Sequence, residues 1–356
     1  MSESGGDAAP PVVAWIERDT GDDTVLVESR IRGTVVGLDP TGAVVLAVGD
    51  PTAVISPRST VKPLQAVGML LAGLDAAFGP GGGIPPELLA IVSSSHSGEP
   101  EQLAAVRAVL AAAGCGEDAL ACPADLPIGR LAHERHLAAG GGPERLLMNC
   151  SGKHAGMIAT CVAAGWPVAG YTAPAHPLQR RIRATIEELT GATIESTAVD
   201  GCGAPLFGVP LLGLARGLRG IALAAAGPSS PRQRVAVAMR AFPELVGGPG
   251  RPDTELMLAV PWIIAKDGAE GVTVAATATG YAVAVKIEDG SQRAAMPVLV
   301  TALRRIGALD PGAVPGAGTG PAPAASPDVG RLDALSAPVV LGGGVPVGRL
   351  RCSSPG

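Results

Sequence analysis

Ser59 and Lys62 are the residues whose types and spacing most directly indicate chemistry. On a helix, residues three apart lie on one face, so the Lys62 amine could contact the Ser59 hydroxyl. The apolar residues at 64–71 would bury this helix and lower the pKa of the amine toward the range of a general base. The pattern indicates a nucleophile with its own base, although Ser-x-x-Lys also occurs as a solvated pair on exposed helices.

Two later segments could add polar groups to the same site. In residues 91–100, a short apolar strand is expected to run into a polar turn that contains Ser95 and His96. In residues 263–271, Lys266 follows an apolar segment and precedes glycines. This order follows the signature of serine β-lactamases and penicillin-binding proteins, but the last two elements depart from its S-D-N and K-T-G forms. The departures argue against an ordinary β-lactam enzyme.

A third cluster could bind a metal ion. Cys150, Lys153 and His154 lie in one Gly-flanked segment, and Cys202 lies in another some fifty residues later. Thiols with an amine or imidazole suit a soft divalent ion such as zinc, although the spacing is not that of a zinc finger. The alternative is that both cysteines are small buried residues. Lysine is a rare ligand because its amine must first lose a proton.

Six motifs in a fixed order make the chain resemble the bacterial L-asparaginase II family, the Rhizobium etli type of L-asparaginase. The resemblance extends from about residue 25 to residue 347. It implies a serine β-lactamase-like fold, hydrolysis of L-asparagine to L-aspartate and ammonia, two Ser-Lys pairs, one zinc ion and a homodimer. The motifs are RSTVKPLQA, SSSHSGEP, NCSGKHAGM, HPLQRRI, DGCGAP and AKDGAEGV.

The resemblance also implies roles for individual residues. It pairs Ser59 with Lys62 and Ser95 with Lys266 as the catalytic groups. The metal ligands it implies are Cys150, Lys153 and Cys202, and the residues it places at the substrate are Arg58, His96, Asp200 and Gly201.

Some alternatives stay open at this point. Ser95 could be the nucleophile with Ser59 as a proton relay, and His96 could equally be a structural histidine. Ile31 stands where family members usually have a histidine, which could change the polarity of the pocket. A glutaminase or peptidase of the same fold, or a binding protein without activity, would also be compatible with the motifs.

Composition narrows the classes of protein. The net charge of -5, without a basic run, argues against a nucleic-acid partner. No basic and apolar leader precedes the first motif and no stretch of apolar residues could span a bilayer, so a cytoplasmic location without membrane contact is expected. Six cysteines at irregular spacings are expected to be thiols rather than a disulfide framework.

These groups must be positioned by helices and strands. The pattern of apolar residues predicts an α/β fold with an antiparallel sheet flanked by helices and a helical subdomain. Residues 1–24 are expected to be a flexible segment, and residues 25–356 a single catalytic domain with a loop expansion at 311–330. Apolar patterning predicts the following elements: strands at 25–29, 33–38, 43–48, 272–276, 280–287 and 338–341, and helices from 59 and at 101–113, 155–164, 177–189, 232–241 and 291–306.

Overall fold

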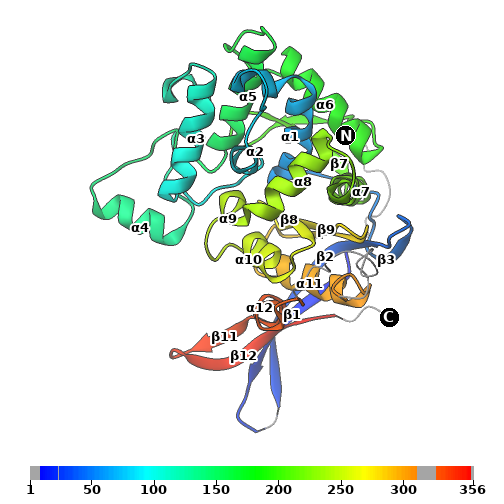
Figure 1. The fold of residues 1–356 in the computed structure, drawn as a ribbon. Coiled ribbons are helices and arrows are strands. Elements are labelled where there is room, and N and C mark those ends of the chain that lie inside the picture. The colour runs from blue at the N-terminus through cyan, green and yellow to red at the C-terminus, as the bar shows by residue number, and fades with distance from the viewer. Residues whose placement is uncertain (1–8, 23, 311–325, 354–356) are drawn as a thin grey trace, which may run out of the picture.

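The computed structural model describes residues 9–22, 24–310 and 326–353, which form an antiparallel sheet and a helical part stacked on it (Figure 1). The sheet has 8 strands in the order β11-β12-β1-β2-β10-β9-β8, with β3 paired to β2. Its strands are β1 (Val12–Asp19), β2 (Val25–Leu38), β3 (Val44–Val48), β8 (Ile263–Gly268), β9 (Val272–Thr277), β10 (Ala282–Ile287), β11 (Val339–Gly342) and β12 (Val345–Cys352). Two short pairs lie outside it: β4 (Val54–Ile55) with β7 (Val209–Pro210), and β5 (Thr197–Val199) with β6 (Pro205–Phe207).

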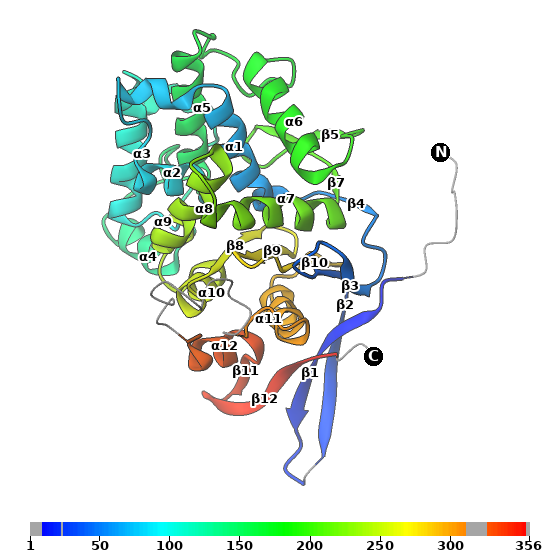
Figure 2. The same cartoon turned by 45° about the vertical axis from the view of Figure 1, so that its right-hand side comes forward.

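The helical part is inserted between β3 and β8, and Figure 2 shows it on one side of the sheet. It also carries a 3-10 turn at Arg58–Val61. Its helices are α1 (Lys62–Leu71), α2 (Pro86–Val92), α3 (Pro100–Ala112), α4 (Arg130–Ala138), α5 (Ser151–Ala163), α6 (Pro177–Thr190), α7 (Leu211–Leu223), α8 (Pro231–Ala241), α9 (Pro243–Val246) and α10 (Pro252–Ala259). Helices α11 (Ala295–Arg305) and α12 (Val329–Ser336) lie on the other side of the sheet.

The central strands are buried on both faces. Every residue of β9 is buried, because α7 packs on one face of this strand and α11 on the other. Strands in this position carry continuous apolar runs instead of an alternating pattern. One cluster of buried apolar side chains extends from the sheet into the helical part, so the two parts share a core.

Helix α5 brings the segment with Cys150 and Lys153 close to the loop that carries Ser95. It is buried along residues 151–161, and its glycines allow a close approach to α2. A Cβ at Gly156 would lie 2.7 Å from the Val92 side chain, and one at Gly152 would collide with the Ile91 carbonyl. The start of α5 therefore lies beside the loop that follows α2 and carries Ser95.

The predicted fold class is confirmed, and so are the helices and strands listed above in type and approximate position, with corrections. The strand expected at Ile91 and Val92 is wrong, because both residues end helix α2, which begins with a proline at its first turn. The strands expected at 25–29 and 33–38 form the single strand β2. Gly33 lies within it, where the backbone of β10 runs too close for a side chain.

The flexible segment expected at 1–24 is also wrong in part. Residues Val12–Asp19 form β1, which is paired with both β2 and β12 in the sheet. Of the loop expansion expected at 311–330, residues 311–325 lie outside the described residues and residues 329–330 begin α12. Within the described part of the chain, no helix is both long enough and apolar enough to cross a membrane.

Candidate active site

A cavity of about 360 Å³ lies between the helical part and the end of β8. Three kinds of segment converge on it: the turn before α1, the loop after α2, and the starts of α5 and α10. Of the residues that the sequence predicted, those that line the cavity are Arg58, Ser59, Ser95, Cys150, Asp200, Gly201 and Cys202.

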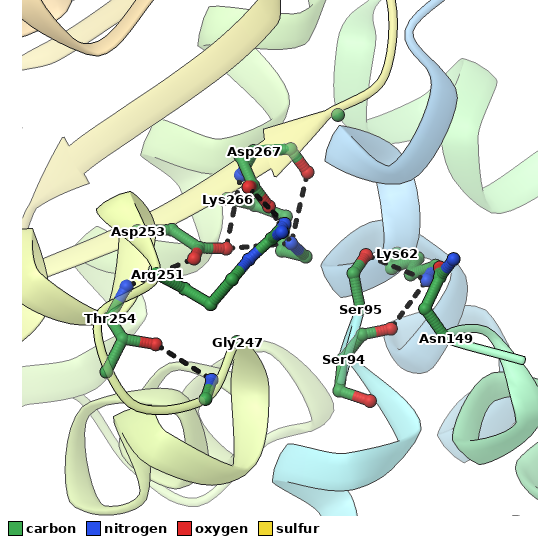
Figure 3. A network of polar contacts seen from close by, with 12 residues as sticks. Lys62, Ser94, Ser95, Asn149, Gly247, Arg251, Asp253, Thr254, Lys266 and Asp267 are labelled. Carbon is green, nitrogen blue, oxygen red and sulfur yellow. Dashed lines mark hydrogen bonds and ion pairs between the residues drawn. The ribbon is translucent and has the colours of Figure 1, made fainter. Parts of the chain in front are cut away.

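Lys62 is a buried amine without a carboxylate partner. Its side chain is 1% exposed, and no ion pair in the described part of the chain includes it. Nζ donates to Ser95 Oγ at 2.9 Å and to the Ser94 carbonyl at 2.6 Å (Figure 3). Burial lowers the pKa of Lys62, and the nearby lysine charges lower it further, against an opposing effect of Cys150. These surroundings favour the neutral amine that a general base requires.

Ser59 lies in the 3-10 turn that leads into α1, with a half-buried side chain that faces the cavity. Its hydroxyl has no hydrogen bond within the described residues, so the predicted contact of Lys62 with Ser59 is replaced by contact with Ser95. Arg58, directly before it, has a φ of 50°, which is rare for a residue with a side chain. A Cβ at Gly268 would lie 3.3 Å from the Ser59 nitrogen, so the β8 backbone runs directly against this turn.

Lys266 has the opposite environment from Lys62 although it is equally buried. Its amine donates to Asp253 Oδ2 at 2.8 Å, to Asp267 Oδ1 at 2.6 Å and to the Asp267 carbonyl at 3.0 Å. These acceptors use all three N–H groups, and the predicted pair with Ser95 is not formed among the described hydrogen bonds. Burial opposes the charge, but the two carboxylates outweigh it and raise the pKa of Lys266. Lys266 is therefore a cation in this arrangement.

Arg58 and Asp200 form another wall of the cavity. Arg58 Nε donates to Asp200 Oδ1 at 2.7 Å, and Glu270 lies 3.8 Å from the same guanidinium. Burial works to raise the pKa of Asp200, but the charges of Lys153 and Arg58 lower it overall. Asp200 is therefore an ionised carboxylate at the cavity, next to Gly201.

The predicted metal ligands converge behind this wall. Lys153 Nζ lies 3.0 Å from Cys202 Sγ, and all three side chains, Cys150 included, are buried. A hydrogen bond from Cys202 is the main cause that lowers the pKa of Cys150. Burial opposes it, but the two sulfurs raise the pKa of Lys153. Two adjacent thiols and an amine form a donor set that fits zinc with a fourth position left for water.

One buried atom next to the metal motif also lacks a partner. His154 Nδ1 is bonded to the Tyr171 hydroxyl at 2.6 Å, whereas Nε2 has no hydrogen bond within the described residues. The same residues contain no group of three or more His, Cys, Asp or Glu side chains that could hold a metal ion. The candidate ligands Cys150, Lys153 and Cys202 do not form such a group, because one of the three is a lysine.

His96 and Ile31 do not line the cavity. His96 Nε2 is bonded to Ser151 Oγ at 2.7 Å, and burial lowers the pKa of His96 to about 3. The ring is a neutral link between the loop after α2 and the start of α5, which is the structural alternative considered above. Ile31 is buried in β2 opposite Ala14, so its side chain belongs to the core.

Three residues of the site were missed or not interpreted from the sequence: Arg251, Asp253 and Asp267. Arg251 and Asp267 line the cavity and form an ion pair at 2.6 Å. The segment Gly250-Arg251-Pro252-Asp253 carried a usable signal, because a proline at the first helical turn marks a helix start and places the preceding arginine at its end. Nothing in the sequence linked this segment to Lys266.

Comparison with known proteins gives one family. The model of the family described as L-asparaginase II matches residues 24–322. A search of curated proteins found no match. A β-lactamase from Mycobacterium bovis is 15% identical over 77% of this chain and 94% of its own, with a TM-score of 0.44. A β-lactamase from Desulfarculus baarsii is 18% identical over 76% and 88%, with a TM-score of 0.34. Both likenesses are distant, and nothing about the activity of this chain follows from them.

Proposed function

The chain belongs to the L-asparaginase II family, and we propose that it hydrolyses the side-chain amide of L-asparagine to L-aspartate and ammonia. Family membership supports an amidohydrolase of the asparaginase type. The observation that carries the mechanism is a buried lysine without a carboxylate partner, Lys62, in contact with a serine hydroxyl at a cavity lined by two serines. A nucleophile beside its base is the arrangement that acyl transfer requires.

We assign the nucleophile to Ser59. It is the more exposed of the two serines, and its turn lies against the backbone of Gly268, where N–H groups could stabilise an oxyanion. Lys62 follows the 3-10 turn directly and its backbone N–H bonds to the Ser59 carbonyl, so the two side chains, three apart, share one face, and in this proposal the Lys62 amine turns to Ser59. Ser95 holds this amine and serves as a proton relay.

The proposed reaction has two half-reactions, acylation of Ser59 and hydrolysis of the ester. Ser59 Oγ attacks the amide carbon while its proton passes to neutral Lys62, and the resulting ammonium protonates the departing nitrogen, which leaves as ammonia. The product is an aspartyl ester of Ser59. Water then attacks the ester carbon, gives a proton to Lys62, and Ser59 regains a proton as the C–O bond breaks. Lys266, as a cation, takes no proton in this scheme and fixes the carboxylates around it.

We further propose that Cys150, Lys153 and Cys202 hold one zinc ion. When bound, the ion would supply a positive charge that polarises groups at the wall of the cavity. No step above passes through it, because the serines and Lys62 already provide nucleophile and base. The homodimer implied by the resemblance stays a prediction.

Ammonia release from L-asparagine and L-glutamine, together with ring opening of a β-lactam followed by absorbance, tests the substrate of the wild type. Activity on asparagine alone supports the proposal, equal activity on glutamine indicates a broader amidohydrolase, and no turnover of any of the three indicates a binding protein. Rapid-quench intact mass then tests the nucleophile. The adduct should be present in the wild type and in Ser95→Ala, and absent in Ser59→Ala; the reverse pattern would assign the attack to Ser95.

A further inference from the structure

Arg251 is a half-buried arginine at the cavity with hydrogen-bonding capacity to spare. It directly precedes α10, and its side chain is 27% exposed. Nη2 donates to Asp267 Oδ2 at 2.6 Å. Nε is buried and has no partner within the described residues. A guanidinium has five N–H donors in a planar fork, so an acceptor is missing on one side of this group.

The surrounding charges hold Arg251 in place but do not accept hydrogen bonds from all of its N–H groups. Asp267 uses Oδ1 for Lys266 and Oδ2 for Arg251, so each oxygen already accepts from a cation (Figure 3). Asp253, the other carboxylate in the cluster, accepts from Lys266 at 2.8 Å and has no ion pair with Arg251 among the described residues. The neighbouring Lys266 and Arg251 hold the pKa of Asp267 low against burial, so Asp267 stays ionised. On this wall Arg251 therefore has one carboxylate partner, which it shares with Lys266, and N–H donors left over.

The lining around Arg58 is richer in carboxylates. There, Arg58 is paired with two of them, Asp200 at 2.7 Å and Glu270 at 3.8 Å, and the charge of Lys153 also acts on Asp200. A ligand with a carboxylate at one end and an ammonium at the other would match the Arg251 and Arg58 parts of the lining. An α-amino acid has these two charges on one carbon, and its side chain remains free to reach the serines.

We propose that Arg251 is the specificity-determining residue that binds the α-carboxylate of the substrate. The inference rests on the proposed function as an amidohydrolase and adds the group that selects amides bearing a carboxylate. A charge-assisted, bidentate contact from a planar fork to a carboxylate gives both orientation and affinity. Asp267 positions the fork and receives no substrate contact in this assignment.

The test compares L-asparagine with 3-aminopropanamide, which has the same amide and amine but no carboxylate. Arg251→Met should lower kcat/KM for asparagine by about 30-fold to 100-fold, the loss expected for a hydrogen-bonded charge. It should change kcat/KM for 3-aminopropanamide by less than about threefold, because that amide never used the contact. Arg251→Lys keeps the charge but lacks the planar fork. Its kcat/KM for asparagine should lie between those of the wild type and Arg251→Met, and it replaces Arg251→Met in the test if that variant does not fold.

Arg234→Met is the matched control. Arg234 is also half-buried, at 26% exposure, and is paired with one carboxylate, Asp75, away from the cavity. This variant should leave both substrates unchanged. Equal losses on both substrates in the Arg251 variants would show a structural role and overturn the inference, and so would unchanged activity on asparagine.

Calorimetric binding of L-aspartate separates this inference from the proposed function. Wild type should bind it, and Arg251→Met should bind at least about tenfold more weakly. Binding that depends on Arg251 in a protein that releases no ammonia would keep the inference and refute the function. Ammonia release with Arg251-independent binding of L-aspartate would do the opposite.

Discussion

Two lysines buried to the same extent should differ in their response to replacement by methionine. Lys266 and Lys62 are 0% and 1% exposed, but only Lys266 has carboxylate partners. Lys266→Met leaves the buried Asp253 without its counter-charge, and removing one partner of a buried ion pair costs about 3 to 5 kcal/mol. We therefore expect the free energy of unfolding to fall by that amount.

Lys62→Met should be close to neutral for stability. The replacement leaves the Ser94 carbonyl and the Ser95 hydroxyl without their shared donor, which costs about 1 to 3 kcal/mol. It also removes a buried amine whose charged form is penalised by burial, and methionine keeps the apolar volume. The two effects offset each other, so stability should stay within about 1 kcal/mol of the wild type, while activity is lost.

Urea unfolding measures the free energy of unfolding of both variants, and an m-value equal to that of the wild type makes the values comparable. The deficit of Lys266→Met should shrink as the pH falls. Removing the ammonium raises the folded-state pKa of Asp253 further above its unfolded value, and a carboxyl group with a raised folded-state pKa loses stability as the pH rises through the range between the two. Adding Asp253→Asn should recover part of the loss, because a neutral amide needs no counter-charge. Equal deficits for the two lysine variants, or a deficit unchanged by pH, would refute this reasoning.

Three further predictions concern activity and metal. Ammonia release should decline as the pH is lowered, because a base with a depressed pKa is active only above that pKa; Lys62→Arg should lose most activity at every pH, and full activity in this variant would exclude Lys62 as the base. Elemental analysis should find about one zinc per chain, lost in the Cys150→Ser, Cys202→Ser variant and weaker at acidic pH; unchanged zinc would place the ion elsewhere. Gly268→Ala should lower kcat by roughly tenfold or more, because its Cβ would lie 3.0 Å from the Pro57 carbonyl and displace the Ser59 turn, whereas Gly82→Ala, in open space, should be silent.

Local sequence patterns were sufficient for most single elements. The 3.6-residue periodicity of residues 177–189 predicted α6, and the apolar runs at 272–276 and 280–287 predicted β9 and β10, because burial on a helix face or in a sheet leaves a direct mark on the order of residues. Four apolar residues ending at Val92 did not distinguish a strand from a helix, since a run this short fits either.

The sequence by itself also determined which residues meet in the site, through motifs that resemble a known family. Most of the predicted residues line one cavity or lie directly behind it. Which of them touch was decided only by the tertiary structure. Lys62 contacts Ser95, thirty-three positions away, and not Ser59, because the packing of α5 against α2 fixes where the Ser95 loop lies.

The charge of Lys62 and of Lys266 likewise could not be predicted from the sequence. Both lysines lie among apolar residues, which predicts a lowered pKa for each. Asp253 and Asp267 reverse this for Lys266, and they reach it from α10 and from its own strand. An ion pair depends on distances of about 3 Å between side-chain atoms, and only the packing of α10 against β8 sets those distances.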